Sequence, residues 1–65
     1  MKVIKKGDIL RSLETSTMFN VQKDSRYVFM AKKTRQKQLM FQVHEVGKKQ
    51  IKLVPDIFFA ETWRN

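Results

Sequence analysis

The side chains that most often carry catalysis are scarce in this 65-residue chain. It contains a single histidine, His44, and no cysteine. Glu45 is next to His44, but successive side chains of a strand point to opposite faces, so the two cannot form a catalytic pair directly. The six carboxylates are spread along the chain at Asp8, Glu14, Asp24, Glu45, Asp56 and Glu61. We therefore expect a protein that is not an enzyme.

Metal and cofactor sites are not expected either. Hard cations need several converging oxygen ligands, and softer metals need more than one histidine or thiolate. The chain has only two glycines and no glycine-rich phosphate-binding loop. A domain of this size also has difficulty enclosing a pocket of the usual ~300 Å³ or more. The sequence thus predicts no metal, no cofactor and no small-molecule substrate.

Charge is the strongest signal in the composition. Fourteen lysines and arginines stand against six acids, which gives a formal net charge of +8. Such an excess suits a polyanionic partner: a nucleic acid, an anionic membrane surface or an acidic protein surface. The simpler explanation is that lysines blunt the sheet edges of a small β-rich protein and keep it in solution, although positive charge does the latter less well than negative charge.

Most of this charge is concentrated in one part of the chain. Between Arg26 and Lys52 there are eight basic residues and one acid, Glu45, so this part carries +7 of the net +8. Lysine outnumbers arginine by ten to four, which favours contact with a phosphate backbone over bidentate reading of bases. The candidate nucleic-acid-binding residues are Lys32, Lys33, Arg35, Lys37, Lys48, Lys49 and Lys52, together with Tyr27 and His44.

Aromatic and β-branched residues predict two neighbouring strands in this region, Tyr27–Lys33 and Gln38–Val46. A three-residue loop at 34–36 would place Phe29 opposite Phe41. A longer loop would mix apolar and charged side chains on one face, so the three-residue loop is favoured. The core face would then carry Tyr27, Phe29, Ala31, Leu39, Phe41 and Val43.

The next hairpin follows the same pattern. With Gly47-Lys48-Lys49 as its loop, His44 lies opposite Lys52, and Leu53 and Ile51 join the core face. The outer face would carry Val28, Met30, Lys32, Met40, Gln42, His44, Gln50 and Lys52. The sequence therefore predicts a three-stranded meander with a core face and a basic face, whose positive surface extends roughly 25–30 Å along the middle strand.

The flanking segments are less regular. Residues 9–13 form either a strand leading into a long polar loop, which we favour, or a short helix capped by Asp8. Pro55 ends the third strand because it cannot donate a ladder hydrogen bond. Asp56 then caps a single helical turn, and residues 61–63 form a last strand that pairs with the N-terminal segment. The alternative is one helix from Ile57 to Arg64.

This order of elements resembles that of SH3-like small barrels, with residues 15–25 as the long first loop and 55–59 as the one-turn helix. The resemblance implies a single domain over residues 1–65, a mainly all-β, five-stranded SH3-like barrel. The ALYDY motif and the paired-proline groove of SH3 domains are absent, so their peptide-binding role is not implied. An OB-like barrel is the main alternative, but its long middle helix has no counterpart here.

Two functions follow from these patterns. The first is a nucleic-acid-binding protein acting on DNA or RNA, with Phe19, Tyr27 and Trp63 as candidates for stacking on bases. The second is a protein-interaction module or small regulator that docks on an acidic surface of a larger protein. Met18, Phe19, Met30 and Met40 are its candidate contacts, and a homodimer formed through an open edge strand belongs to the same hypothesis.

The cellular setting is inferred from what the sequence lacks. The absence of cysteine fits a reducing compartment, and no signal peptide or apolar run of roughly 20 residues occurs. We expect a cytoplasmic protein, and membrane binding is disfavoured because no basic amphipathic helix is predicted. The initial Met and the short length are also what a complete small open reading frame of a phage or plasmid would show.

Overall fold

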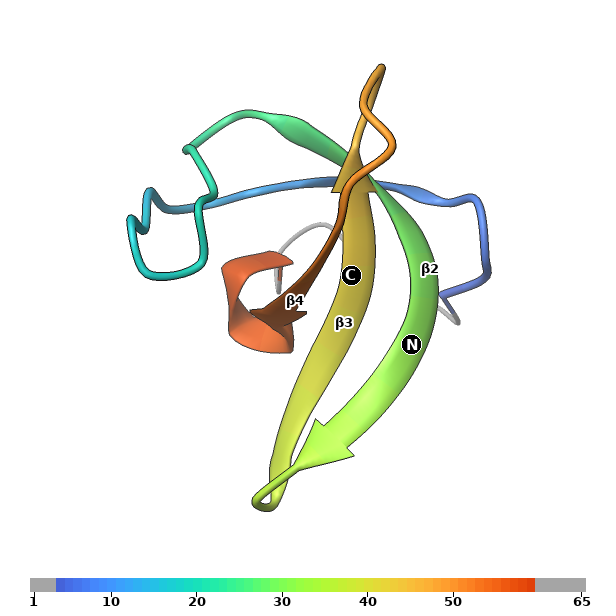
Figure 1. Ribbon diagram of the computed structural model, residues 1–65, viewed down its shortest axis with the longest axis vertical. Coiled ribbons are helices and arrows are strands. Elements are labelled where there is room, and N and C mark those ends of the chain that lie inside the picture. Colours follow the sequence, from blue (N-terminus) through green and yellow to red (C-terminus); the bar gives the residue numbers. More distant parts are fainter. Residues whose placement is uncertain (1–3, 60–65) are drawn as a thin grey trace.

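A computed structural model of the protein describes residues 4–59. Four strands form one antiparallel sheet in the order β1-β2-β3-β4 (Figure 1). The sheet is not closed into a barrel, and the expected fifth strand at 61–63 lies outside the described residues. The elements are β1 (Ile9–Arg11), β2 (Arg26–Arg35), β3 (Gln38–Glu45), β4 (Ile51–Pro55) and the 3₁₀ turn η1 (Asp56–Phe59).

The core lies on the side of the sheet against which Phe59 of η1 packs. Tyr27, Phe29, Phe41 and Val43 are buried there, as the sequence predicts. Phe59 of η1 stacks parallel to Phe41, with ring centroids 6.2 Å apart and an interplanar angle of 8°. Aromatic pairs of this kind add about 0.5–1.5 kcal/mol beyond the area that they bury, so η1 contributes directly to the stability of the meander.

The register of the first hairpin differs from the prediction. Its turn contains two residues, Gln36 and Lys37, both with positive φ (49° and 67°), and not the expected three-residue loop. A β-bulge between Phe29 and Ala31 adds a second irregularity. Phe29 therefore pairs with Val43, not with Phe41. The two deviations together shift this pairing by two residues, which leaves Phe29 on the core face.

Beyond the bulge the side chains of β2 change faces. Lys32 is the Cα partner of Phe41, so it lies on the side of the sheet that carries the core, opposite to the prediction. It is nevertheless exposed. The core does not extend to this part of the hairpin, where residues 32–38 are exposed, so a charged side chain is in water on either face of the sheet. The expected alignment of Lys32 with His44 on one face is thus wrong.

The second hairpin is shifted by one residue from the prediction. His44 pairs with Ile51, and Val43 pairs with Lys52. A shift of one residue exchanges the two faces of a strand. Val54 is consequently fully buried, whereas Ile51 is 53% exposed and Leu53 is half-buried on the outer face. The predicted assignment of Ile51 and Leu53 to the core face is wrong.

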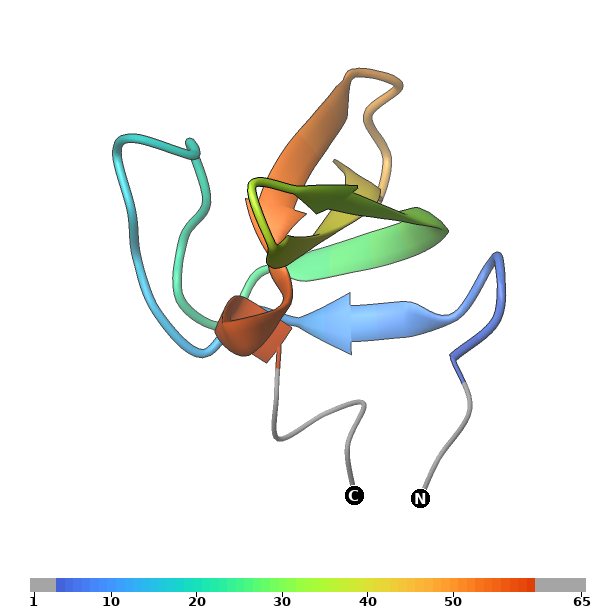
Figure 2. The ribbon, with the colours of Figure 1, turned by 90° about the horizontal axis from the view of Figure 1, so that it is seen from below.

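The long loop between β1 and β2 is tied to the core at several points. The backbone of Ser16 pairs with that of Val21, which is buried. The Leu13 amide donates to the Phe58 carbonyl oxygen of η1 at 2.8 Å. Figure 2 shows this loop standing away from the sheet on the side of η1. The strand-then-loop prediction for residues 9–13 is confirmed, although β1 itself ends at Arg11.

The single helical turn is also found where the sequence predicts it, and Asp56, its first residue, is buried. Residues 60–64, which a continuous helix would have to include, lie outside the described residues. Among residues 4–59 there is no helix with the length and apolar character needed to cross a bilayer.

The outer part of the β2–β3 hairpin extends beyond the rest of the sheet. β4 pairs with β3 only as far as Pro55 opposite Met40. Residues 32–39 therefore form a two-stranded ribbon, seen at the bottom of Figure 1. We call this segment the basic ribbon, because four of its eight residues are lysine or arginine.

Candidate functional site

The basic ribbon presents its four cations to solvent. Lys33 and Arg35 lie on one face, Lys32 on the other, and Lys37 in the turn, and all four are exposed. The two side-chain ion pairs among the described residues are elsewhere: Arg11 with Asp24 at 3.9 Å and Lys48 with Glu45 at 3.8 Å. The ribbon charges are therefore not neutralised by any carboxylate within residues 4–59.

A second, smaller group of cations lies at the other end of β3. Lys48 and Lys49 are exposed in the connection between β3 and β4, at the top of Figure 1. Lys48 is partly compensated by Glu45. The eight residues of β3 separate the two groups by about 25 Å. The positive surface is thus divided between the two ends of β3.

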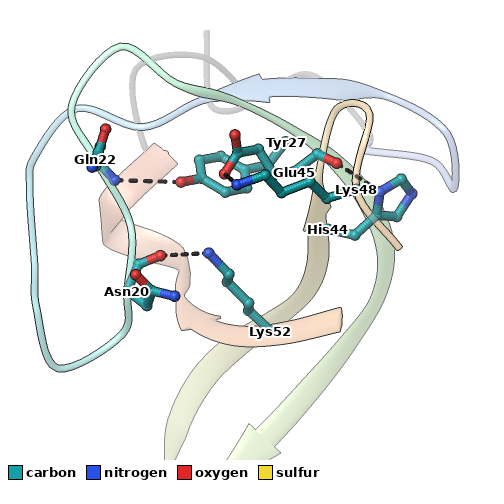
Figure 3. Close-up of polar contacts among 7 residues, drawn as sticks. All are labelled: Asn20, Gln22, Tyr27, His44, Glu45, Lys48 and Lys52. Carbon is teal, nitrogen blue, oxygen red and sulfur yellow. Dashed lines mark hydrogen bonds and ion pairs between the residues drawn. The ribbon is translucent and has the colours of Figure 1, made fainter. Parts of the chain in front are cut away.

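Lys52, expected to join these two groups, points to the other side of the sheet. Its Nζ donates to the carbonyl oxygen of Asn20 in the long loop at 2.5 Å, and lies 5.7 Å from the centroid of the Tyr27 ring (Figure 3). A lysine can bury its alkyl stem along apolar surface while its ammonium group finds a polar partner. Lys52 therefore has a structural role, and the prediction of one continuous cationic strip is wrong.

Tyr27 is not available for stacking on a base. It is 1% exposed, and its ring packs edge-on against Phe59 with centroids 5.9 Å apart. Its hydroxyl oxygen accepts a hydrogen bond from the Gln22 amide at 3.3 Å (Figure 3). Tyr27 thus joins the long loop to the core, which is the more common role for an aromatic residue in a strand.

His44 lies on the outer face in an otherwise apolar row. Val28 and Ile51 are its neighbours on β2 and β4, and Ile9 continues the row on β1. His44 is half-buried, and its Nδ1 lies 3.1 Å from the carbonyl oxygen of Glu45. Because no basic side chain of the ribbon lies in this row, His44 belongs to a different surface from the four ribbon cations.

Two of the residues predicted to contact a protein are brought together. Phe19 and Met40 line a cavity of about 510 Å³ beside the basic ribbon, and this cavity is open to solvent. Met18 is exposed in the loop, and Met30 is half-buried at the bulge. We call this cavity the ribbon groove; it is lined by Phe19, Arg35, Gln36, Gln38, Met40 and Pro55.

Three residues of the ribbon groove were not predicted as functional. Gln36 and Gln38 lie on either side of Lys37 in the chain, and Pro55 was interpreted only as the end of a strand. Pro55 could have indicated the groove, because the position of this proline also determines where β4 stops pairing with β3. The proximity of Phe19 depends on the path of the long loop, for which the sequence has no clear pattern.

Within residues 4–59 no group of three or more histidine, cysteine or acidic side chains is arranged to hold a metal ion. Comparisons with protein-family models, with curated proteins and with solved structures found no match to the chain.

Proposed function

We propose that this protein binds nucleic acid, and that the basic ribbon is the main contact with the phosphate backbone. The observation that carries the proposal is the group of four exposed cations on a projecting hairpin, none of which is paired with a carboxylate of residues 4–59. Desolvated or paired cations would gain little from phosphates, whereas free ones release condensed counterions from the nucleic acid when they bind.

The shape of the ribbon also supports the proposal. A two-stranded antiparallel ribbon is narrow enough to enter the major groove of a duplex, and it can equally lie along a single strand. Three of its four cations are lysines, which act as point charges and recognise phosphates without reading bases. We therefore expect binding that depends weakly on sequence.

The salt dependence of affinity tests this proposal. If all four ribbon cations neutralise phosphates, a plot of log K against log salt concentration has a slope of about −3.6 for duplex DNA and about −2.8 for a single strand. Affinity then falls by roughly 50- to 150-fold between about 50 and about 200 mM salt. Fluorescence anisotropy of a labelled oligonucleotide measures both quantities, and an affinity that does not change with salt would exclude the proposed contact.

A pair of matched variants assigns the contact to the ribbon. Lys32→Gln with Lys33→Gln removes two charges from the ribbon, while Lys5→Gln with Lys23→Gln removes two exposed charges elsewhere. The ribbon variant should make the slope shallower by about 1.4–1.8, because each lost phosphate contact contributes about 0.7–0.9. The control should change it much less. Equal effects of the two variants would mean that binding depends on net charge and not on the ribbon.

We also infer that the complete fold is an SH3-like barrel closed by a fifth strand at 61–63. The order of strands, the long first loop and the 3₁₀ turn before this segment support the inference. A fifth strand that pairs with β1 would protect its amides from hydrogen exchange. Rapid exchange of all amides in 61–63 would count against closure.

A second candidate function, contact with a protein, is favoured by the apolar row on the outer face. Ile9 and Ile51 at its two ends are each 53% exposed, and Val28 lies between them in the same row. Uncovered apolar surface of this kind often marks an interface. Sedimentation of the chain and of Ile9→Glu, together with capture of partners from lysate after nuclease treatment, tests this candidate; unchanged behaviour of the variant in both would argue against it.

A further inference from the structure

The ribbon groove combines an apolar floor with a polar rim. Met40 and Pro55 form the buried floor, and the half-buried ring of Phe19 forms one wall. Gln36, Gln38 and Arg35 stand exposed around it. Ligand sites are typically of this composition, with apolar walls and a few polar groups that fix orientation. Among the described residues that line the groove there is no carboxylate.

The walls of the groove are held in place by the fold. The ring of Phe19 packs edge-on against Phe58, with centroids 5.6 Å apart, and its amide donates to Ser16 Oγ at 3.4 Å. Its neighbour Asn20 is fixed by the hydrogen bond from Lys52. On the opposite side, the backbone pairing of Arg35 with Gln38 closes the tight turn at Gln36, which lines the groove together with Pro55 at the end of β4. The groove is therefore present before any ligand arrives.

We propose that the ribbon groove binds an unpaired base of a single-stranded nucleic acid whose phosphates lie along the basic ribbon. The proposal rests on the proposed function and adds the class of nucleic acid. A base has apolar faces that can pack on Phe19. Its edge carries donors and acceptors, which the side-chain amides of Gln36 and Gln38 can match because an amide offers both.

Charge connects the groove to the ribbon. Arg35 belongs to both, so a base in the groove would have its own phosphate beside an exposed guanidinium. A guanidinium also pairs with a phosphate through two parallel hydrogen bonds. In a duplex the bases are stacked and paired, and one would have to be flipped out at additional energetic cost before it could enter. The groove therefore favours single strands.

The test compares labelled oligothymidylate with a blunt DNA duplex of the same length. We expect the single strand to bind at least about 5-fold more tightly from one stacked base, once both salt plots are extrapolated to about 1 M, where the steeper counterion term of the duplex no longer contributes. Phe19→Ala should weaken single-strand binding by roughly 5- to 140-fold while the salt slope stays unchanged, because no cation is removed. Phe19→Leu, which keeps an apolar side chain but no ring, should change affinity in the same direction by less.

A second pair of variants does not depend on a packed residue. Gln38 is exposed beside the groove, and Gln50 is exposed in the connection between β3 and β4. Gln38→Ala should weaken single-strand binding by roughly 2- to 12-fold through the loss of a hydrogen bond. Gln50→Ala should leave it unchanged. Circular dichroism of each variant is the control that tests whether its fold is kept.

The outcomes separate this inference from the proposed function. Equal affinity for single strand and duplex, with no effect of Phe19→Ala or Gln38→Ala, would overturn the groove while leaving the ribbon contact intact. No binding of either nucleic acid would overturn both. Binding of an acidic peptide that Phe19→Ala abolishes, without any binding of oligothymidylate, would assign the groove to a protein partner and also overturn the inference.

Discussion

The turn of the basic ribbon gives a prediction in which the same substitution has opposite effects at two sites. Lys37 lies in the turn with φ of 67°, whereas Lys33 lies in the extended backbone of β2. Both side chains are exposed lysines. Lys37→Gly and Lys33→Gly therefore remove the same charge and the same side chain, and the two variants differ only in the backbone conformation that the glycine has to adopt.

The magnitudes follow from the conformational preferences of glycine. A left-handed conformation costs a side-chain-bearing residue roughly 1–2 kcal/mol, and glycine avoids this penalty. Its greater freedom in the unfolded chain costs about 0.5–1 kcal/mol at either site. Lys37→Gly should therefore raise the free energy of unfolding by about 0.5–1 kcal/mol, while Lys33→Gly should lower it by about 0.5–1 kcal/mol.

Thermal unfolding followed by circular dichroism measures the difference. A change of 1 kcal/mol shifts the melting temperature of a domain of this size by about 4–8 °C, so the two variants should melt roughly 4–16 °C apart. Binding of oligonucleotide should be weakened about equally by both, since each loses one cation. Destabilisation of Lys37→Gly to the same extent as Lys33→Gly would refute the two-residue turn and the register that depends on it.

Three further substitutions test the packing. Lys52→Met should lower the free energy of unfolding by about 1–2 kcal/mol through loss of the bond to the loop carbonyl and the contact with the aromatic ring, whereas Lys49→Met, at an exposed site, should have little effect in the same urea titration. Phe41→Ala should cost about 3–5 kcal/mol, which is a large part of the stability of so small a domain, and an unchanged urea midpoint for this variant would contradict the assigned core. Gly47→Ala should cost about 0.5–1 kcal/mol, which is the left-handed penalty at φ of 87° less the lost freedom of glycine in the unfolded chain, because no atom of the described residues lies within 4 Å of the added methyl group. An unchanged melting temperature would show that this loop has another conformation.

The strands and much of the core were predictable from local pattern. Alternating aromatic residues correctly placed Tyr27, Phe29, Phe41 and Val43 in the interior. The partner of Phe29 was wrong by two residues, but an even shift does not change the face of a side chain. The burial of Phe29 was therefore predicted correctly, although the predicted register of β2 against β3 was wrong.

The registers themselves could not be obtained from the sequence. Two-residue hairpin turns are usually signalled by asparagine or glycine, and the turn at Gln36-Lys37 contains neither. In β4 the larger apolar residues, Ile51 and Leu53, favoured the wrong face. Lys52 lies on the core side because it pairs with Val43, and its ammonium group finds a partner there in Asn20, 32 residues earlier in the chain. Such a long-range partner leaves no local pattern.

The candidate site was predictable only where it depends on residues that are close in sequence. The four ribbon cations are consecutive enough in the chain that any hairpin would expose them together. The ribbon groove needs three segments that are distant in sequence: the loop with Phe19, the hairpin and the end of β4. Their convergence is a property of the folded chain, so sequence patterns identified single members of the groove and not the groove itself.

The bulge between Phe29 and Ala31 divides β2 into an inner and an outer half, and the alternation of side chains between the two faces of the sheet is interrupted between them. In the inner half every second side chain packs in the core, and in the outer half no side chain is buried. Substitutions in the outer half of β2 should therefore cost little folding stability. The tip of the hairpin can vary in sequence while the inner half of the strand keeps the fold.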